Sequence, residues 1–133
     1  MKRLVLFVSL VFTLTAPLYA LGITQPSDCP TIAALQAVGV NDAENLMGWF
    51  ASSQNNFDTP DQWVFAILVG QAKDKNDAIK RGNKRIGLLS IVEGPRAEGN
   101  DTWSCLYSNK SRNIIAFAIT PIDNPLNFLK YLK

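Results

Sequence analysis

Two cysteines, Cys29 and Cys105, constrain the fold of this chain more than any other feature, because they lie at opposite ends of its one domain-sized segment. They follow a leader of the exported type, and exported proteins meet an oxidising compartment in which thiols pair. A redox pair would need a CxxC spacing and a nucleophilic cysteine would need a histidine partner, but the chain contains no histidine. We therefore expect one intramolecular disulfide, and closing a loop of about 76 residues would contribute roughly 4 to 5 kcal/mol at most.

The leader begins with a short basic head and continues with an uncharged apolar run from Leu4 to Ala16. This pattern predicts a secretory signal peptide over residues 1–20 with cleavage after Ala20, and a single mature domain over residues 21–133. An uncleaved membrane anchor is the alternative, but a membrane-spanning helix needs roughly 20 apolar residues and this run is shorter. We expect a secreted or periplasmic protein with no stable membrane insertion after cleavage.

Charge is balanced in the expected mature chain. Of the 13 Lys and Arg residues, Lys2 and Arg3 leave with the signal peptide, so that 11 remain against 11 Asp and Glu residues. A neutral domain has no long-range field that concentrates nucleic acid, so we expect no nucleic-acid partner. The sequence does not define an oligomeric state.

Helical patterns occur in three places. After Asp74, apolar residues recur every three or four positions; Asp74 is placed to cap this helix, and Asp77 precedes Arg81 by four residues. An earlier short helix begins at Pro30 and is stopped by Gly39, and a final amphipathic segment presents leucines on one side. The expected helices cover residues 30–38, 74–92 and 124–132.

Strand patterns occur in four places. Gln62–Gly70 is apolar on both faces, which is typical of a strand in the centre of a sheet. Alternation over residues 102–107 places Trp103, Cys105 and Tyr107 on one face. The expected strands cover residues 40–53, 62–70, 102–107 and 114–120, and residues 93–100 form a loop by composition.

These elements predict an α+β fold. It has a small antiparallel sheet of about four strands with helices packed on one face, in the order α-β-β-α-β-β-α, closed by one disulfide. Antiparallel pairing is expected because the last two apolar runs are short and separated only by a polar connection.

No catalytic machinery is visible in the sequence. The absence of histidine excludes the common triads and dyads, and no phosphate loop or nucleophile-elbow serine is present. Two carboxylate pairs, Asp58 with Asp61 and Glu93 with Glu98, could share acid and base roles, but acids in loops are usually only solvated. Calcium could use the oxygens of the first pair, yet a proline interrupts the spacing. We expect no catalytic residue and no metal site.

Basic residues gather on one side of the expected helix over residues 74–92. They could contact an acidic partner or a membrane surface, or they could form the solvated side of an amphipathic helix, and the zero net charge favours the second interpretation. These residues are Lys73, Lys75, Lys80, Arg81, Lys84 and Arg85.

Aromatic residues are the remaining candidates for a binding site. Large rings usually form the core of a small domain, but rings that line a cleft would suit a flat apolar ligand or a hydrophobic segment of a partner. The aromatic residues considered are Trp49, Phe50, Phe57, Trp63, Trp103 and Tyr107.

Several landmarks follow one another along the chain. Cys29-Pro30 opens a helix, residues 57–60 read FDTP, Gly94-Pro95 lies in the expected loop, and residues 103–107 read WSCLY. In this order they resemble a family of short exported bacterial proteins of poorly defined function, some of which are labelled haemin-binding. The resemblance covers nearly all of the mature chain and implies export and a shared fold.

Haemin is the specific ligand that this resemblance suggests. Haem iron takes an axial His, Met, Tyr or thiolate, so the mature candidates are Met47, Tyr107 and Tyr131. Together with the tryptophans, the candidate ligand-binding residues are Met47, Trp49, Trp63, Trp103 and Tyr107. We therefore expect a secreted, non-enzymatic binding protein for haemin or another flat apolar ligand. The alternative is a secreted or envelope protein, host-directed or structural, that interacts with other proteins and has no small ligand.

Overall fold

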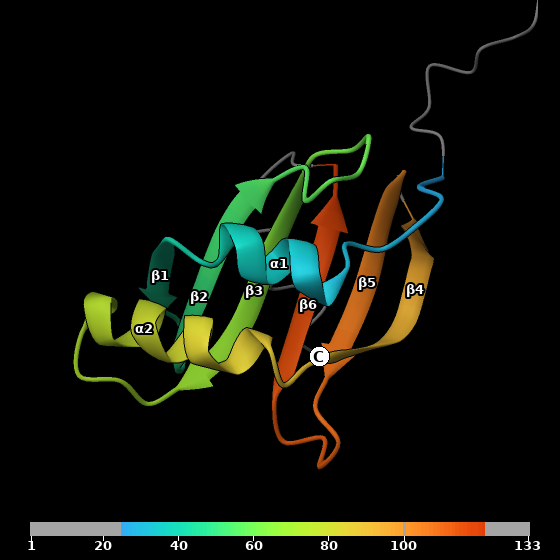
Figure 1. Cartoon of the computed structure of the whole chain (residues 1–133). Coiled ribbons are helices and arrows are strands. Elements are labelled where there is room, and N and C mark those ends of the chain that lie inside the picture. The colour runs from blue at the N-terminus through green and yellow to red at the C-terminus, as the bar shows by residue number, and fades with distance from the viewer. Residues whose placement is uncertain (1–24, 100, 122–133) are drawn as a thin grey trace, which may run out of the picture.

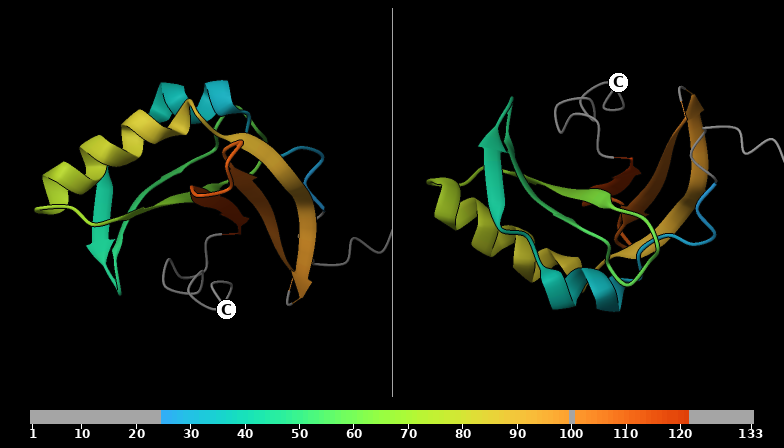
Figure 2. Two further views of the ribbon diagram at one scale, coloured as in Figure 1. Left: turned by 90° about the horizontal axis from the view of Figure 1, so that it is seen from below. Right: turned by 90° about the horizontal axis from the view of Figure 1, so that it is seen from above.

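The computed structural model describes residues 25–99 and 101–121, and within them the chain forms a six-stranded antiparallel sheet and two helices (Figure 1). Along the chain the elements are α1 (Ile32–Val38), β1 (Asp42–Asn45), β2 (Trp49–Asn55), β3 (Trp63–Gly70), α2 (Lys75–Ile86), β4 (Ser90–Gly99), β5 (Thr102–Ser108) and β6 (Ile115–Thr120). The strand order is β1-β2-β3-β6-β5-β4, so β3 and β6 are central and β1 and β4 are the edges. Both helices lie on the same face of the curved sheet (Figure 2).

Helix α1 begins and ends at residues with capping chemistry. The Thr31 hydroxyl accepts a hydrogen bond from the Ala34 amide at 3.1 Å. At the other end Gly39 has a φ of 71°, which glycine adopts without steric cost, and its amide donates to the Leu35 carbonyl at 2.7 Å. The helix therefore ends where the sequence predicts but begins after Pro30 rather than at it.

Helix α2 packs on the sheet through a small residue. Its N-cap is Asp74, as the sequence predicts. Gly82 lets the helix approach β2 closely, because a Cβ atom at this position would lie 2.8 Å from the Ala51 Cβ. The helix ends at Ile86, before the predicted end near Val92, because the chain then turns into β4.

Apolar side chains are buried on both faces of the sheet. The larger cluster lies between the sheet and the helices and includes Leu35, Phe65 and Tyr107. The smaller cluster lies on the opposite face, because alternation along each strand sends neighbouring side chains to opposite sides. We call this opposite face the second face, and its cluster consists of Phe50, Ala66, Phe117 and Ile119, with Leu46 and Leu68 packed against it.

Edge strand β4 has an irregular backbone. Its pairing with β5 shifts in register at three places, and Gly94, with a φ of 129°, precedes a cis peptide bond to Pro95. Such irregularities are found mainly on edge strands, where fewer ladder hydrogen bonds depend on them. They also remove the period-two pattern, so the sequence predicts a helix end and a loop here instead of a strand.

The predicted fold class is wrong. The described residues contain six strands where about four are expected, and the sheet dominates the two helices. One missed strand is β4. The other is β1, which the sequence merges with β2 into a single strand over residues 40–53, although Met47 and Gly48 turn the chain there with positive φ values. The predicted order α-β-β-α-β-β-α is replaced by α-β-β-β-α-β-β-β.

Two predicted segments lie outside the described residues. They are the signal peptide over residues 1–20 and the last helix over residues 124–132. Within residues 25–99 and 101–121, neither helix combines the length and the apolar character that a membrane crossing requires.

Candidate functional site

A cleft of about 430 Å³ opens beside the disulfide, where three segments that are distant in the sequence meet. They are the segment before and at the start of α1, the turn between β2 and β3, and the irregular part of β4. A volume of this size falls in the usual range of small-ligand sites. We call it the disulfide cleft, and its lining comes from residues 27–31, 57–61 and 91–95.

The disulfide between Cys29 and Cys105 joins the segment before α1 to β5, with the two Cα atoms 5.9 Å apart, and confirms the predicted bridge. Gly94 lies directly against it. A Cβ atom at residue 94 would lie 2.9 Å from the Cys29 Sγ and 2.8 Å from the Ser104 carbonyl oxygen, so the backbone of β4 reaches the disulfide only because this residue is glycine.

The turn between β2 and β3 forms another side of the cleft and is anchored by Phe57. The Phe57 ring is only 2% exposed and packs edge-on against Phe65, with ring centroids 6.3 Å apart. Phe57 and Asp58 both have positive φ values, 48° and 59°, and the Phe57 amide donates to the Asn55 Oδ1 at 3.0 Å. The buried ring therefore fixes the turn while the Asp58 carboxylate remains exposed.

The Thr59 hydroxyl holds the rest of this turn. It donates to the Asn56 carbonyl at 2.7 Å, and it accepts from the Asp61 amide at 3.2 Å and from the Trp63 indole N–H at 2.9 Å. Because Trp63 is itself fully buried at the start of β3, the turn is tied to the core. Both ends of the segment that carries Asp58 and Asp61 are thus held in place.

Three carboxylates border the disulfide cleft, and none of the described residues that line it is basic. Asp28 and Asp58 are exposed and Asp61 is half-buried, and none of the three forms an ion pair with another described residue. Apolar lining comes from Phe57, Ile91 and two prolines. An acidic rim beside apolar lining complements a ligand that carries a positive charge and an apolar group.

The five residues predicted to bind a ligand do not gather at one place. Trp63 and Tyr107 are fully buried in the main core. Trp49 is half-buried at the opposite end of the β2 and β3 pair, because the register aligns Trp49 with Gly70 and Asn55 with Trp63. None of these three side chains lines the disulfide cleft.

The two other predicted residues are also apart from the cleft. Met47 is completely exposed in the turn between β1 and β2. Trp103 lies on β5 between Ala97 of β4 and Thr120 of β6, and its buried indole N–H has no hydrogen-bond partner among the described residues.

Haem does not fit these positions. The Tyr107 hydroxyl donates to the Pro30 carbonyl at 2.6 Å, and burial raises the pKa of this phenol, so binding iron as phenolate would require the core to open. Met47 is the other described candidate, but it is completely exposed on the turn between β1 and β2 and does not line the disulfide cleft. Tyr131 lies outside the described residues.

The second predicted carboxylate pair is held by an arginine. Arg96 contacts the Oε1 atoms of Glu93 and Glu98 at 3.3 and 3.4 Å, and the Ser104 hydroxyl donates to Glu98 at 2.6 Å. These acids are therefore engaged in structural contacts on β4. Across the part of the chain that the structure describes, no group of three or more His, Cys, Asp or Glu side chains is arranged to hold a metal ion.

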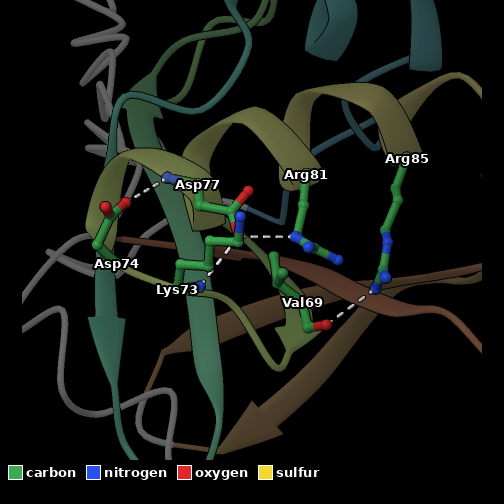
Figure 3. Close-up of polar contacts among 6 residues, drawn as sticks. All are labelled: Val69, Lys73, Asp74, Asp77, Arg81 and Arg85. Carbon is green, nitrogen blue, oxygen red and sulfur yellow. Dashed lines mark hydrogen bonds and ion pairs between the residues drawn. The ribbon is translucent and has the colours of Figure 1, made fainter.

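The polar contacts on the basic side of α2 serve the fold (Figure 3). The Asp77 carboxylate accepts from the Lys73 amide at 3.0 Å and from the Arg81 Nε at 2.9 Å, and these two bonds lower the pKa of Asp77. The predicted pair with Arg81 is thus confirmed. Arg85 donates to the Val69 carbonyl at 3.1 Å, which braces the helix on β3. Arg81 and Arg85 thus both make contacts within the domain. This favours a solvated helix face over a surface that binds an acidic partner or a membrane.

The sequence over residues 28–132 matches a protein family described as Domain of unknown function (DUF4949). The chain belongs to this family. The DUF4949 domain includes both cysteines of the disulfide and all but the first residue of the cleft lining. Comparison with curated proteins gives no match, and comparison with solved structures gives none either.

The disulfide cleft was missed by the prediction of binding residues, although its parts are visible in the sequence. Three landmarks of the resemblance, Cys29-Pro30, FDTP at residues 57–60 and Gly94-Pro95, contribute to its lining. No pattern in the sequence shows that these segments meet, because the disulfide and the irregular backbone of β4 bring them together. The disulfide also indicates an oxidising compartment outside the cytoplasm.

Proposed function

We propose that the mature DUF4949 protein is a secreted or periplasmic, non-enzymatic binding protein whose disulfide cleft holds a ligand with a positive charge and an apolar group. A basic segment of another polypeptide has both features. The observation that carries the proposal is the set of three carboxylates, Asp28, Asp58 and Asp61, beside apolar side chains, with no basic residue in the part of the lining that the structure describes.

The rigidity of the cleft supports recognition. One side is held by the hydrogen bonds of Thr59 and by the buried Trp63, and another by the close approach of Gly94 to the disulfide. A site that is already ordered loses little conformational entropy when a ligand binds. Catalysis is disfavoured because the chain has no histidine to supply a base near neutral pH.

The chemistry of the cleft favours a polypeptide partner over the haemin expected from the sequence. Haemin carries two carboxylate groups, which the three carboxylates of the cleft would repel. A basic protein segment would be attracted by the same groups. We therefore retain the alternative expectation from the sequence, which is a secreted or envelope protein that interacts with other proteins.

Isothermal titration calorimetry with two matched peptides tests this proposal. The mature protein, residues 21–133, is titrated with Ac-Lys-Phe-Lys-NH2 and with Ac-Glu-Phe-Glu-NH2, which share the ring and differ in charge. We expect saturable binding of the basic peptide alone, weakening as the salt concentration rises, because exposed charges are screened. Equal binding of both peptides, or no binding of the basic one, would contradict the proposal.

A pair of variants locates the binding. The double substitution Asp58→Asn and Asp61→Asn removes two of the three carboxylates at nearly constant shape, and we expect it to weaken binding of the basic peptide roughly two- to tenfold. Asp101→Asn is the matched control, since this exposed acid lies outside the cleft at a position with a φ of 56° that asparagine tolerates. An unchanged affinity of the double variant for the basic peptide would show that the peptide does not bind at the disulfide cleft.

Haemin is tested in parallel by absorbance. The account predicts no saturable shift of the Soret band when haemin is added to the mature protein. A saturable shift that disappears in Met47→Ala would restore haemin as the ligand and would argue against the cleft.

A further inference from the structure

The second face of the sheet carries a cluster of buried apolar side chains, which a sheet face in contact with water would not bury. Phe50, Phe117 and Ile119 lie on it and are only 6%, 7% and 8% exposed. Both described helices lie on the other face (Figure 2). An antiparallel sheet that buries apolar side chains on both faces needs a covering layer on each.

The course of the chain leads from this cluster directly into residues 122–133. Strand β6 is central in the sheet, between β3 and β5, and it contributes both Phe117 and Ile119 to the second face. It ends at Thr120, so the residues that follow leave from the middle of the sheet rather than from an edge. Helices α1 and α2 already pack on the other face of the sheet. The second face is therefore the one on which the residues after β6 can pack.

Residues 122–133 have the length and the pattern for this position. Leu126, Leu129 and Leu132 recur every third residue, which places them on one side of a helix. The expected helix over residues 124–132 has nine residues and would be about 14 Å long, which matches the roughly 14 Å across three strand spacings from β6 to β1. The family match continues to residue 132, so this segment belongs to the DUF4949 domain.

The charge of the segment also fits the second face. A hollow of about 350 Å³ beside Phe50 and Val64 is bordered by Glu44 and by Asp42. The Asp42 carboxylate is already paired with Lys75 of α2 at 2.6 Å, so Glu44 is the acid that this hollow offers to a further basic group. The only charged residues after Asp123 are two lysines, Lys130 and Lys133. We propose that residues 122–133 dock on the second face of the sheet, with their leucines against the apolar cluster and their basic end towards Glu44 of β1.

Nuclear magnetic resonance of the mature protein tests this docking without any substitution. We expect nuclear Overhauser effects between the methyl groups of Leu126, Leu129 and Leu132 and the rings of Phe50 and Phe117. Contacts of these methyl groups with Leu35 and the helices would overturn the proposal. The proposal would also be overturned if the amides of residues 122–133 exchanged with solvent as fast as those of a free peptide. It would likewise be overturned if the contacts appeared only between differently labelled molecules, because the segment on the second face would then belong to a second copy of the chain.

A double-mutant cycle gives an independent measure. Leu129→Ala and Phe117→Leu are made singly and together, and urea unfolding midpoints are compared. We expect the combined shift to be at least a third smaller than the sum of the single shifts, because each substitution removes part of the same contact. The control pair, Leu129→Ala with Leu35→Ala on the opposite face, should be additive. Additive shifts in the test pair would contradict docking, while binding of the basic peptide at the disulfide cleft is unaffected by either result.

Discussion

At the scale of single residues, Tyr107 illustrates how one side chain connects distant parts of this domain. Its hydroxyl donates to the Pro30 carbonyl at 2.6 Å, and its ring packs edge-on against Phe65 with centroids 6.0 Å apart. The neighbouring disulfide fixes the same N-terminal segment to the same strand, β5. Tyr107 is therefore a structural residue, and the sequence alone could show only that its ring shares a face with Cys105.

Removing this hydroxyl is expected to destabilise the domain. Tyr107→Phe leaves the buried Pro30 carbonyl without its donor, so the free energy of unfolding should fall by about 1 to 3 kcal/mol in urea denaturation at pH 7. Phe65→Leu, which trims the ring that Tyr107 contacts but leaves its hydrogen bond, is a useful comparison. A Tyr107→Phe protein with the stability of the wild type would show that the bond is dispensable.

The pKa of Tyr107 also predicts a dependence on alkaline pH. Burial raises this pKa above its ordinary value near 10, because the phenolate loses solvation in the core. The folded state then keeps a proton that the unfolded state loses, so the stabilisation is complete below about pH 10 and declines as the pH rises further. We expect the wild type to lose stability more steeply than Tyr107→Phe above pH 10. Parallel curves for the two proteins would refute this assignment.

At the scale of elements, the regular ones could be predicted and the irregular ones could not. The periodicity after Asp74 and the doubly apolar run of β3 identify α2 and the central strand, since both depend on local pattern. Strand β4 depends instead on pairing with β5, and its shifts in register hide the alternation. The short polar strand β1 is likewise defined by its partner β2 rather than by its own composition.

Helix α2 provides a test in which packing and helix propensity disagree. Gly82→Ala would raise intrinsic helix propensity by about 1 kcal/mol, but its Cβ atom would lie 2.8 Å from the Ala51 Cβ. We expect net destabilisation of about 1 to 3 kcal/mol, measured by thermal or urea unfolding. Gly87→Ala is the matched control, because its Cβ would meet only the flexible end of Gln36. A stabilised Gly82→Ala protein would mean that α2 packs less closely on β2.

At the scale of the whole molecule, the net charge conceals how the charges are arranged. The expected mature chain is neutral, yet the charged residues among the described lining of the disulfide cleft are all acidic, while the basic residues Lys80 and Lys84 lie on α2. Composition gives only the net charge of the chain and could not reveal a local acidic site. That site depends on three segments whose meeting is set by tertiary structure.

The disulfide is the covalent part of this arrangement. Replacing both Cys29 and Cys105 with alanine opens a loop with a sequence separation of 76 residues. We expect the free energy of unfolding to fall by roughly 2 to 5 kcal/mol, chiefly because the unfolded chain gains freedom. Urea unfolding of the variant and of the oxidised wild type measures the difference. Equal midpoints would show that the bridge does not stabilise the domain.

The most direct test of the binding site is a map of amide chemical shifts. Isotope-labelled mature protein is titrated with Ac-Lys-Phe-Lys-NH2, and each backbone amide is followed. The account predicts saturable shifts concentrated at Phe57, Asp58, Thr59 and Asp61 and at Gly94, the segments that line the disulfide cleft. Shifts that centre on α2 or on the turn at Met47, with the cleft amides unmoved, would contradict it.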